Sequence, residues 1–186
     1  MPKASELDIA IGYVSSDSLI ELQKTVELNS NIHKMNLIIG MHYFDRFTKV
    51  QYNAASKLGQ FLRENSLGDV KLVTAFRYHG KLYSYSNDNG PFAGIIGSNN
   101  LSSIVDGGTR VYESSVLLDD ASSAKKMKDF IVQLDSTASR SISELEITEF
   151  NDENPLLEGH EFVKRMNSYA VAMAMNSRTN TTFEIP

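Results

Sequence analysis

The chain has 186 residues, with 18 Lys and Arg against 23 Asp and Glu, so its formal net charge at pH 7 is −5. This length suits one domain with a small extension, and the 41% share of hydrophobic residues is that of a globular protein. The absence of cysteine excludes disulfides, thiolate metal sites and a cysteine nucleophile. Without a recognisable signal peptide or an apolar run of membrane-spanning length, we expect a cytoplasmic protein with no membrane partner.

Strand-like and helix-like segments alternate over the first 140 residues. Alternating or β-branched residues predict strands over residues 7–14, 35–40, 69–75, 77–85, 91–97 and 110–118. Apolar residues at helical spacing predict helices over residues 19–28, 44–65 and 119–134. In the second of these helices, one apolar stripe is expected to contain Val50, Ala54, Leu58, Phe61 and Leu62. The pattern predicts an α/β fold with a mixed central β-sheet flanked by helices on both faces.

Four polar residues in two neighbouring strand-like segments are the strongest candidates for chemistry. His79 and Lys81 are two residues apart, so alternation along a strand places them on one face. Ser98 and Asn100 follow the next expected strand, and the turn over 87–90 would bring the two pairs together. A histidine can act as nucleophile or general acid, while Lys, Asn and Ser can bind the oxygens of a phosphate.

These residues resemble the signature of the phospholipase D superfamily, in which His-x-Lys is followed by a Gly-x-x-Asn or Ser-x-Asn segment. The chain has His79-Gly-Lys81 and then Gly97-Ser-Asn-Asn100. With Ile9-Ala-Ile-Gly-Tyr-Val-Ser15, these segments look like the NgoFVII-like and BfiI-like restriction endonucleases. The resemblance covers residues 7–134 and implies a phospholipase D-like half-sandwich. Where the fuller motif has an Asp five residues after the Lys, this chain has Ser86.

The resemblance implies a metal-independent phosphodiesterase that cleaves double-stranded DNA through a phosphohistidine, with no cofactor. The catalytic residues expected are His79, Lys81, Asn100 and Ser98, with Glu113 as the acid that follows the Asn in the family. Two such motifs are needed, and the chain has one, so we expect a homodimer with its active site at the two-fold interface. The expected enzyme is a hydrolase, an endodeoxyribonuclease of the type II restriction class.

We expect residues 1–140 to form the phospholipase D-like nuclease domain. Residues 141–186 are expected to form a linker and a C-terminal helical extension, with the start of a DNA-recognition domain as one interpretation. In the extension, Phe162, Met166, Tyr169 and Met173 recur at helical spacing. Because no base-reading motif is visible, a separate DNA-recognition domain or an ATPase subunit is a further partner to consider.

Three alternatives stay open at this level. The chain could be another phospholipase D-type enzyme, either a nonspecific nuclease or a phospholipid hydrolase. It could be a Mg²⁺-dependent nuclease that uses Asp69-Val-Lys71 and Glu64. It could also be a non-catalytic module for nucleic-acid binding or dimerisation. His42, at the end of an expected strand, is interpreted as structural.

Overall fold

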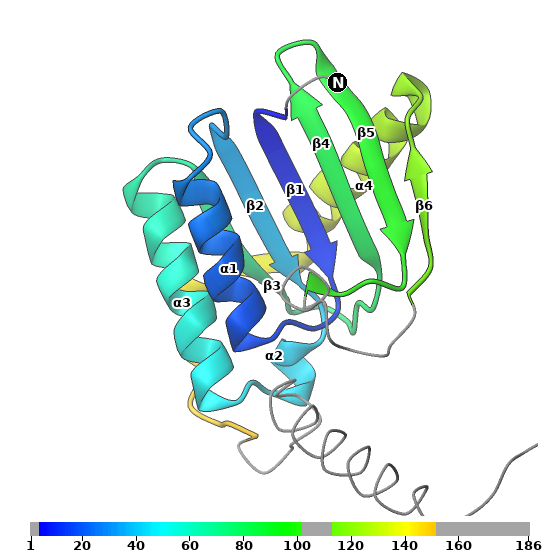
Figure 1. Cartoon of the computed structure of the whole chain (residues 1–186). Helices are drawn as coiled ribbons and strands as arrows, with labels where there is room; N and C mark the ends of the chain where they lie inside the picture. Colours follow the sequence, from blue (N-terminus) through cyan, green and yellow to red (C-terminus); the bar gives the residue numbers. More distant parts are fainter. Residues whose placement is uncertain (1–3, 102–112, 152–186) are drawn as a thin grey trace, which may run out of the picture.

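A mixed seven-stranded β-sheet forms the centre of the molecule (Figure 1). The computed structural model describes residues 4–101 and 113–151. The strands are β1 (Glu6–Ile11), β2 (Lys34–Ile39), β3 (Gly68–Val73), β4 (Lys81–Asn87), β5 (Gly90–Gly97), β6 (Ser115–Leu118) and β7 (Ser139–Ser141). Their order across the sheet is β6-β5-β4-β1-β2-β3-β7. The three strands β1, β2 and β3 are parallel, and the other neighbours pair antiparallel.

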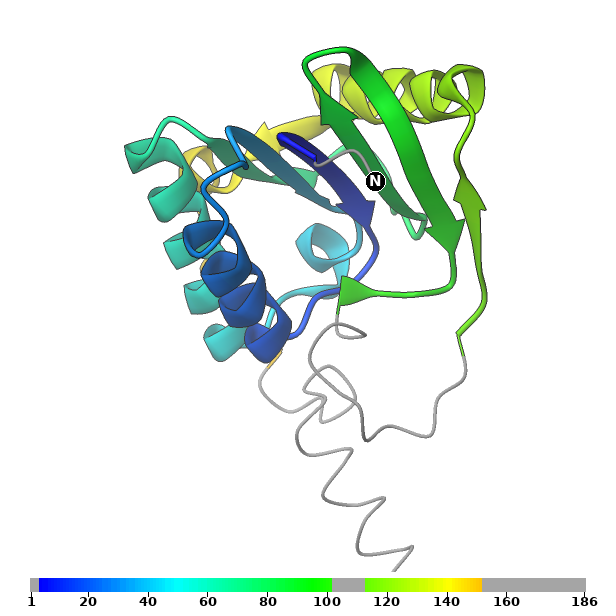
Figure 2. The ribbon, with the colours of Figure 1, turned by 45° about the horizontal axis from the view of Figure 1, so that its top comes forward.

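Helices cover both faces of the sheet (Figure 2). Helices α1 (Ser16–Glu27) and α3 (Lys49–Glu64) lie on one face, and α4 (Ala121–Ala138) lies on the other. Side chains alternate accordingly: Ile9 and Ile11 of β1 belong to the core under α1 and α3, whereas Ala10 packs with residues of α4. The predicted α/β class, the mixed sheet and the helices on both faces are confirmed.

The long helix predicted over residues 44–65 is wrong as a single element. The structure has a short helix α2 (His42–Asp45), then a break, then α3. At the break Arg46 adopts a positive φ of 66°, and the Thr48 hydroxyl accepts from the backbone N–H of Gln51 in a capping box that starts α3. The buried stripe of α3 is also rotated, since Val50 is 55% exposed. The buried residues are Gln51, Ala55, Leu58, Gly59 and Leu62.

Two predicted strands near the candidate residues are shorter than expected. The strand predicted over 77–85 begins only at Lys81, so His79 lies in the connection before β4. The strand predicted over 110–118 is observed as β6, while residues 110–112 lie outside the described residues. The predicted turn over 87–90 is confirmed as the β4–β5 connection. The expected helix over residues 162–173 also lies outside the described part.

The chain continues past its fourth helix into the sheet and the core. β7 pairs antiparallel with β3, and it is followed by the 3₁₀ helix η2 (Ile142–Glu144). Ile142 is buried, and Leu145, Ile147 and Phe150 pack against the core under α1 and α3. The segment after α4 therefore adds the edge strand next to β3 and packs it against the core.

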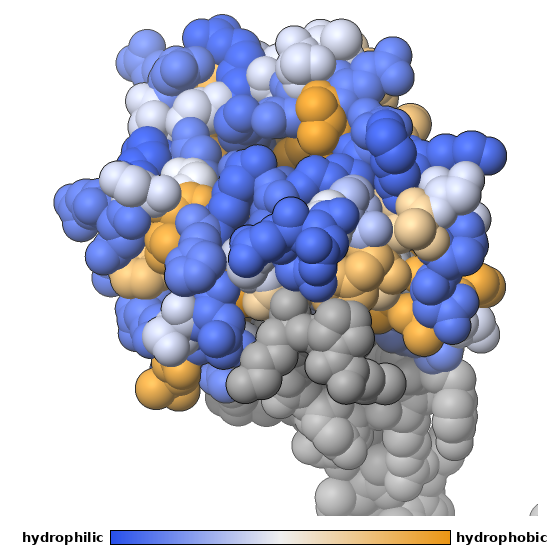
Figure 3. All heavy atoms as spheres, turned by 90° about the horizontal axis from the view of Figure 1, so that it is seen from above, coloured by the Kyte–Doolittle hydropathy of each residue, from blue (hydrophilic) through white to orange (hydrophobic). Residues whose placement is uncertain are grey.

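The end of the molecule seen from above, at the start of β1 and β2, is mostly hydrophilic, with apolar residues in small groups (Figure 3). Across residues 4–101 and 113–151, no helix is long and apolar enough to span a membrane.

The core under α1 and α3 predicts a large stability loss for Leu58→Ala, because Leu58 is fully buried and its truncation leaves a cavity. We expect a loss of about 3 kcal/mol in the free energy of unfolding, measured by urea denaturation. The matched control is Leu28→Ala, since Leu28 follows α1 and is 87% exposed. Its change should stay within about 0.5 kcal/mol. Equal losses in the two variants would contradict this description of the core.

Candidate active site

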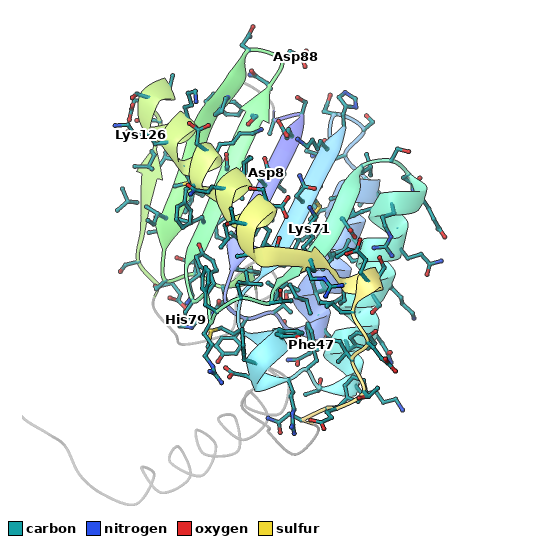
Figure 4. All side chains as sticks on the ribbon, turned by 180° about the vertical axis from the view of Figure 1, so that it is seen from behind. Asp8, Phe47, Lys71, His79, Asp88 and Lys126 are labelled. Carbon is teal, nitrogen blue, oxygen red and sulfur yellow. The ribbon has the colours of Figure 1, made fainter. Side chains whose placement is uncertain are left out.

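The candidate residues come from segments that meet at one rim of the sheet, where β1 ends, β4 begins, β5 ends and β6 begins. The antiparallel register places Ile11 at the end of β1 opposite Lys81 at the start of β4. It also places Gly97 opposite Ser115. His79 lies at this rim, at the opposite end of the hairpin strands from Asp88 in the β4–β5 turn (Figure 4). Antiparallel pairing thus gathers residues far apart in the sequence.

His79 and Lys81 are in direct contact. The Lys81 ammonium nitrogen Nζ lies 3.1 Å from Nε2 and 3.3 Å from Nδ1 of the His79 ring. The ammonium also donates a 2.8 Å hydrogen bond to the backbone carbonyl of His79. Lys81 is only 7% exposed, whereas His79 is exposed to solvent. The site therefore presents an accessible imidazole with a buried cation beside it.

Burial and nearby charges shift the pKa of both groups. Partial burial and then the Lys81 cation lower the pKa of His79, while the Asp45 carboxylate opposes the shift. Burial also lowers the pKa of Lys81, and the negative charge of Glu113 opposes it. A lowered pKa favours the neutral imidazole. Only this form has an unprotonated ring nitrogen, which is the atom that could attack phosphorus. The surroundings of His79 therefore favour its neutral form over the protonated one.

The first three residues after β5, Ser98, Asn99 and Asn100, each have a hydrogen-bond partner in the chain. The backbone N–H of Ser114 donates to the Ser98 hydroxyl at 3.1 Å, and that hydroxyl donates to the Glu113 carboxylate. The Tyr83 hydroxyl donates to the carbonyl of Asn99 at 2.9 Å. Asn100 accepts from the backbone N–H of Tyr13 at 3.5 Å. The segment is thereby held to β1, β4 and the start of β6.

The five predicted residues form one connected group. His79 and Lys81 touch, Glu113 acts on Lys81 through its charge, and Ser98 is hydrogen-bonded to Glu113. Asn100 joins the group through Tyr13, which contacts His79. Because the Ser98 hydroxyl donates a hydrogen bond to the Glu113 carboxylate, this pair connects the residue after β5 to the segment before β6.

Sequence reasoning missed two residues of this rim. The ring centroid of Tyr13 lies 5.5 Å from that of His79 in an edge-to-face arrangement. The Tyr13 hydroxyl donates a 2.6 Å hydrogen bond to Asp45. The sequence signal for Tyr13 was its place in the Ile9–Ser15 segment that resembles the family, but the strand predicted over residues 7–14 included it and gave it no role. Nothing in the sequence pattern around Asp45 indicates its role, because the contact depends on the break after α2.

His42 is structural, as the sequence suggested. It is 1% exposed, stacks on Phe47 at 4.4 Å, and its Nε2 accepts from the backbone N–H of Val14 at 3.2 Å. Its other ring nitrogen therefore carries the proton and lies 3.2 Å from the carbonyl of Arg46. Burial lowers the pKa of His42 to about 4, so the ring is neutral near pH 7.

The departure from the family motif at Ser86 lies away from the site. Ser86 is buried, and its side chain lies on the face of the sheet opposite to that of Lys81 and Tyr83. It accepts a 3.1 Å hydrogen bond from Lys128 of α4. It therefore faces α4 on the back of the sheet rather than the rim that holds His79.

The residues of the Mg²⁺-dependent alternative have partners of their own. Asp69 accepts from Arg63 at 2.5 Å, and Lys71 donates to Asp135 of α4 at 2.7 Å. Within the described ranges, no cluster of three or more His, Cys, Asp or Glu side chains could hold a metal ion. These ion pairs explain Asp69 and Lys71 as links between the sheet and its helices.

A comparison with known protein families finds a match over most of the chain. The family model described as the NgoFVII restriction endonuclease N-terminal PLD domain matches residues 1–147. A search of the curated proteins finds no match. Because the matched span covers most of the chain, the chain belongs to this family. The predicted phospholipase D-type resemblance is confirmed, and the membership supports a nuclease role.

The Lys81–His79 contact predicts a titration that NMR can follow. The His79 imidazole should titrate below 6.5, its ordinary pKa, because burial and the Lys81 cation disfavour the protonated ring. Lys81→Met removes the cation, so the pKa of His79 should rise. Lys126→Met, on the exposed side of α4 (Figure 4), is the matched control and should leave it unchanged. If the pKa of His79 does not change in Lys81→Met, the Lys81 cation does not lower it and this prediction is wrong.

Proposed function

We propose that this chain is the catalytic domain of a restriction endonuclease that hydrolyses phosphodiester bonds of double-stranded DNA without a metal ion, through a phosphohistidine. The observation that carries the proposal is the exposed His79 ring beside the buried Lys81 ammonium. Membership of a restriction endonuclease family supports DNA as the substrate. The phospholipid hydrolase alternative gains no support from the described surface.

The first chemical step is attack on phosphorus. The free ring nitrogen of His79 forms an N–P bond while the bond from phosphorus to the leaving oxygen breaks. Lys81 contributes positive charge and Asn100 contributes amide N–H donors to the non-bridging phosphate oxygens. Asn100 is suited to this role because its side-chain oxygen accepts from Tyr13, which leaves its amide NH₂ as the group for the substrate. Glu113 and Ser98 hold the segment that carries Asn100.

Both steps need a second histidine. In the first step its protonated imidazole donates a proton to the leaving oxygen as the bond from phosphorus to that oxygen breaks. In the second step the same ring, now neutral, accepts a proton from the water whose oxygen attacks phosphorus and breaks the N–P bond. The other histidines are His33, His42 and His160, and none has Lys two residues on. We therefore assign this role to His79 of a second copy across a two-fold axis. The two rings have the same surroundings in the free protein, so one of them must take up a proton when the anionic phosphate binds between them, because a nearby negative charge favours the protonated ring.

The open edge of the sheet beside the rim offers apolar surface for such a contact. In the described chain, Ile96, Val116 and Leu117 are 45%, 59% and 60% exposed, next to Gly97 and Ser115. Reading of a DNA sequence is assigned to a separate recognition domain or subunit, because the catalytic group contacts phosphate rather than base edges.

The mechanism predicts that cleavage of plasmid DNA and of a bis-nitrophenyl phosphate persists in excess EDTA. His79→Ala should lower the rate at least about a thousand-fold, since it removes the nucleophile. His33→Ala is the matched control, because His33 is exposed and precedes β2 at the opposite end of the parallel strands. Activity that requires Mg²⁺ and survives His79→Ala would instead indicate carboxylate chemistry.

The shared site predicts a characteristic result when wild type and His79→Ala are mixed and allowed to exchange subunits. In an equal mixture only about a quarter of random dimers carry two intact copies of His79, so total activity should fall to about a quarter of that of an all-wild-type sample at the same total concentration. Independent sites would give half. Sedimentation velocity should show a dimer, and a fully active monomer would contradict the proposal.

A further inference from the structure

The segment that follows β1 lies directly against the candidate nucleophile. Gly12 is buried, and a Cβ atom at this position would lie 2.6 Å from Cδ2 of His79. The next residue, Tyr13, presents its ring edge-to-face to His79 at an interplanar angle of 73°. The Gly12 backbone and the Tyr13 ring therefore lie against two sides of the His79 imidazole. The position of His79 depends on how firmly this segment is held.

The Tyr13 side chain is anchored at its far end. Its hydroxyl donates to one oxygen of Asp45 at 2.6 Å, and Arg77 donates to the other oxygen at 3.1 Å. The Tyr13 hydrogen bond, followed by Arg77, lowers the pKa of Asp45. Burial raises the pKa of Tyr13 to about 12, so the hydroxyl keeps the proton that it donates. The Tyr13 ring is therefore held at one end by the main chain and at the other by the hydrogen bond of its hydroxyl to Asp45.

The backbone around Tyr13 is fixed as well. The N–H of Val14 donates to buried His42, and the Val14 carbonyl accepts from Gln51 of α3 at 3.2 Å. From this anchored segment the N–H of Tyr13 donates to the side-chain oxygen of Asn100 at 3.5 Å. Of the two polar atoms of the Asn100 side-chain amide only the oxygen accepts a hydrogen bond, so this contact sets which way the amide points.

We propose that Tyr13 is a positioning residue of this site, which holds the His79 ring through its own ring and the Asn100 amide through its backbone N–H. The inference rests on the proposed function. Tyr13 touches two of the residues assigned to phosphate chemistry, yet its hydroxyl is committed to Asp45. Its contribution is the alignment of nucleophile and phosphate-binding amide, which strongly affects the rate of displacement.

The test compares Tyr13→Leu and Tyr13→Phe in the full chain with bis-nitrophenyl phosphate as substrate, in EDTA. Tyr13→Leu removes the ring, so kcat should fall about 10- to 100-fold while KM changes little. Tyr13→Phe keeps the ring and should recover part of the rate. Tyr43→Leu is the matched control, because Tyr43 is 42% exposed on α2 and its ring contacts Phe44. It should leave kcat unchanged.

A second variant and a spectroscopic signal keep the test independent of folding losses. Gly12→Ala leaves Tyr13 in place but pushes on the His79 ring, and it should also lower kcat with little change in KM. In NMR spectra, Tyr13→Leu should remove the ring-current contribution to the His79 proton shifts, and Tyr13→Phe should retain it.

The outcomes separate the two proposals. If His79→Ala abolishes hydrolysis but Tyr13→Leu and Gly12→Ala keep the wild-type kcat, the positioning role is wrong and the proposed function stands. If hydrolysis is absent in the wild type or independent of His79, the proposed function fails, and the positioning role fails with it. A fall in kcat for Tyr13→Leu with partial recovery in Tyr13→Phe supports the inference.

Discussion

The antiparallel pairing of β4 with β1 is the constraint on which the site depends. It sets Lys81 opposite Ile11, so the connection that carries His79 lies against the residues that follow β1. The Gly12 backbone leaves room for the His79 ring, and Tyr13 closes one side of it. β5 and β6 then bring their own ends to the same rim, because each pairs antiparallel with its neighbour. A slip of one residue between β1 and β4 would turn Lys81 to the opposite face.

Burial and the balance of charge around His79 explain why its ring is neutral beside a cation. Partial burial and then the Lys81 ammonium lower the pKa of the ring. In the proposed mechanism the same positive charge also attracts the oxygens of a phosphate. Asp45 acts in the opposite direction, but Tyr13 and Arg77 already share its carboxylate. Glu113 keeps negative charge near Lys81 while it holds Ser98. The rim therefore favours a neutral imidazole in a site suited to an anionic substrate.

Much of this arrangement was predictable from the sequence, because it depends on local patterns. The spacing of His79, Lys81 and Asn100 and the turn before β5 predicted the family, which the family match confirms, and the candidate site. The break before α3 was not predictable by periodicity, since apolar residues continue through it and the capping contact between Thr48 and Gln51 decides where the helix starts. The Tyr13–Asp45 contact joins residues from separate elements across the rim, so it appears only once the sheet and α2 are assembled.

The replacement at Ser86 illustrates how position in the sheet decides the effect of a departure from a family motif. Lys128 of α4 reaches Ser86, and it also forms ion pairs with Glu6 and Asp8 of β1. Two carboxylates of the neighbouring strand therefore supply the negative charge that a carboxylate at position 86 would have offered to this lysine. A third acidic group in this largely buried cluster would add repulsion and a desolvation cost. A serine at position 86 therefore leaves the charge of Lys128 balanced under α4, and the departure does not reach the rim that holds His79 and Lys81.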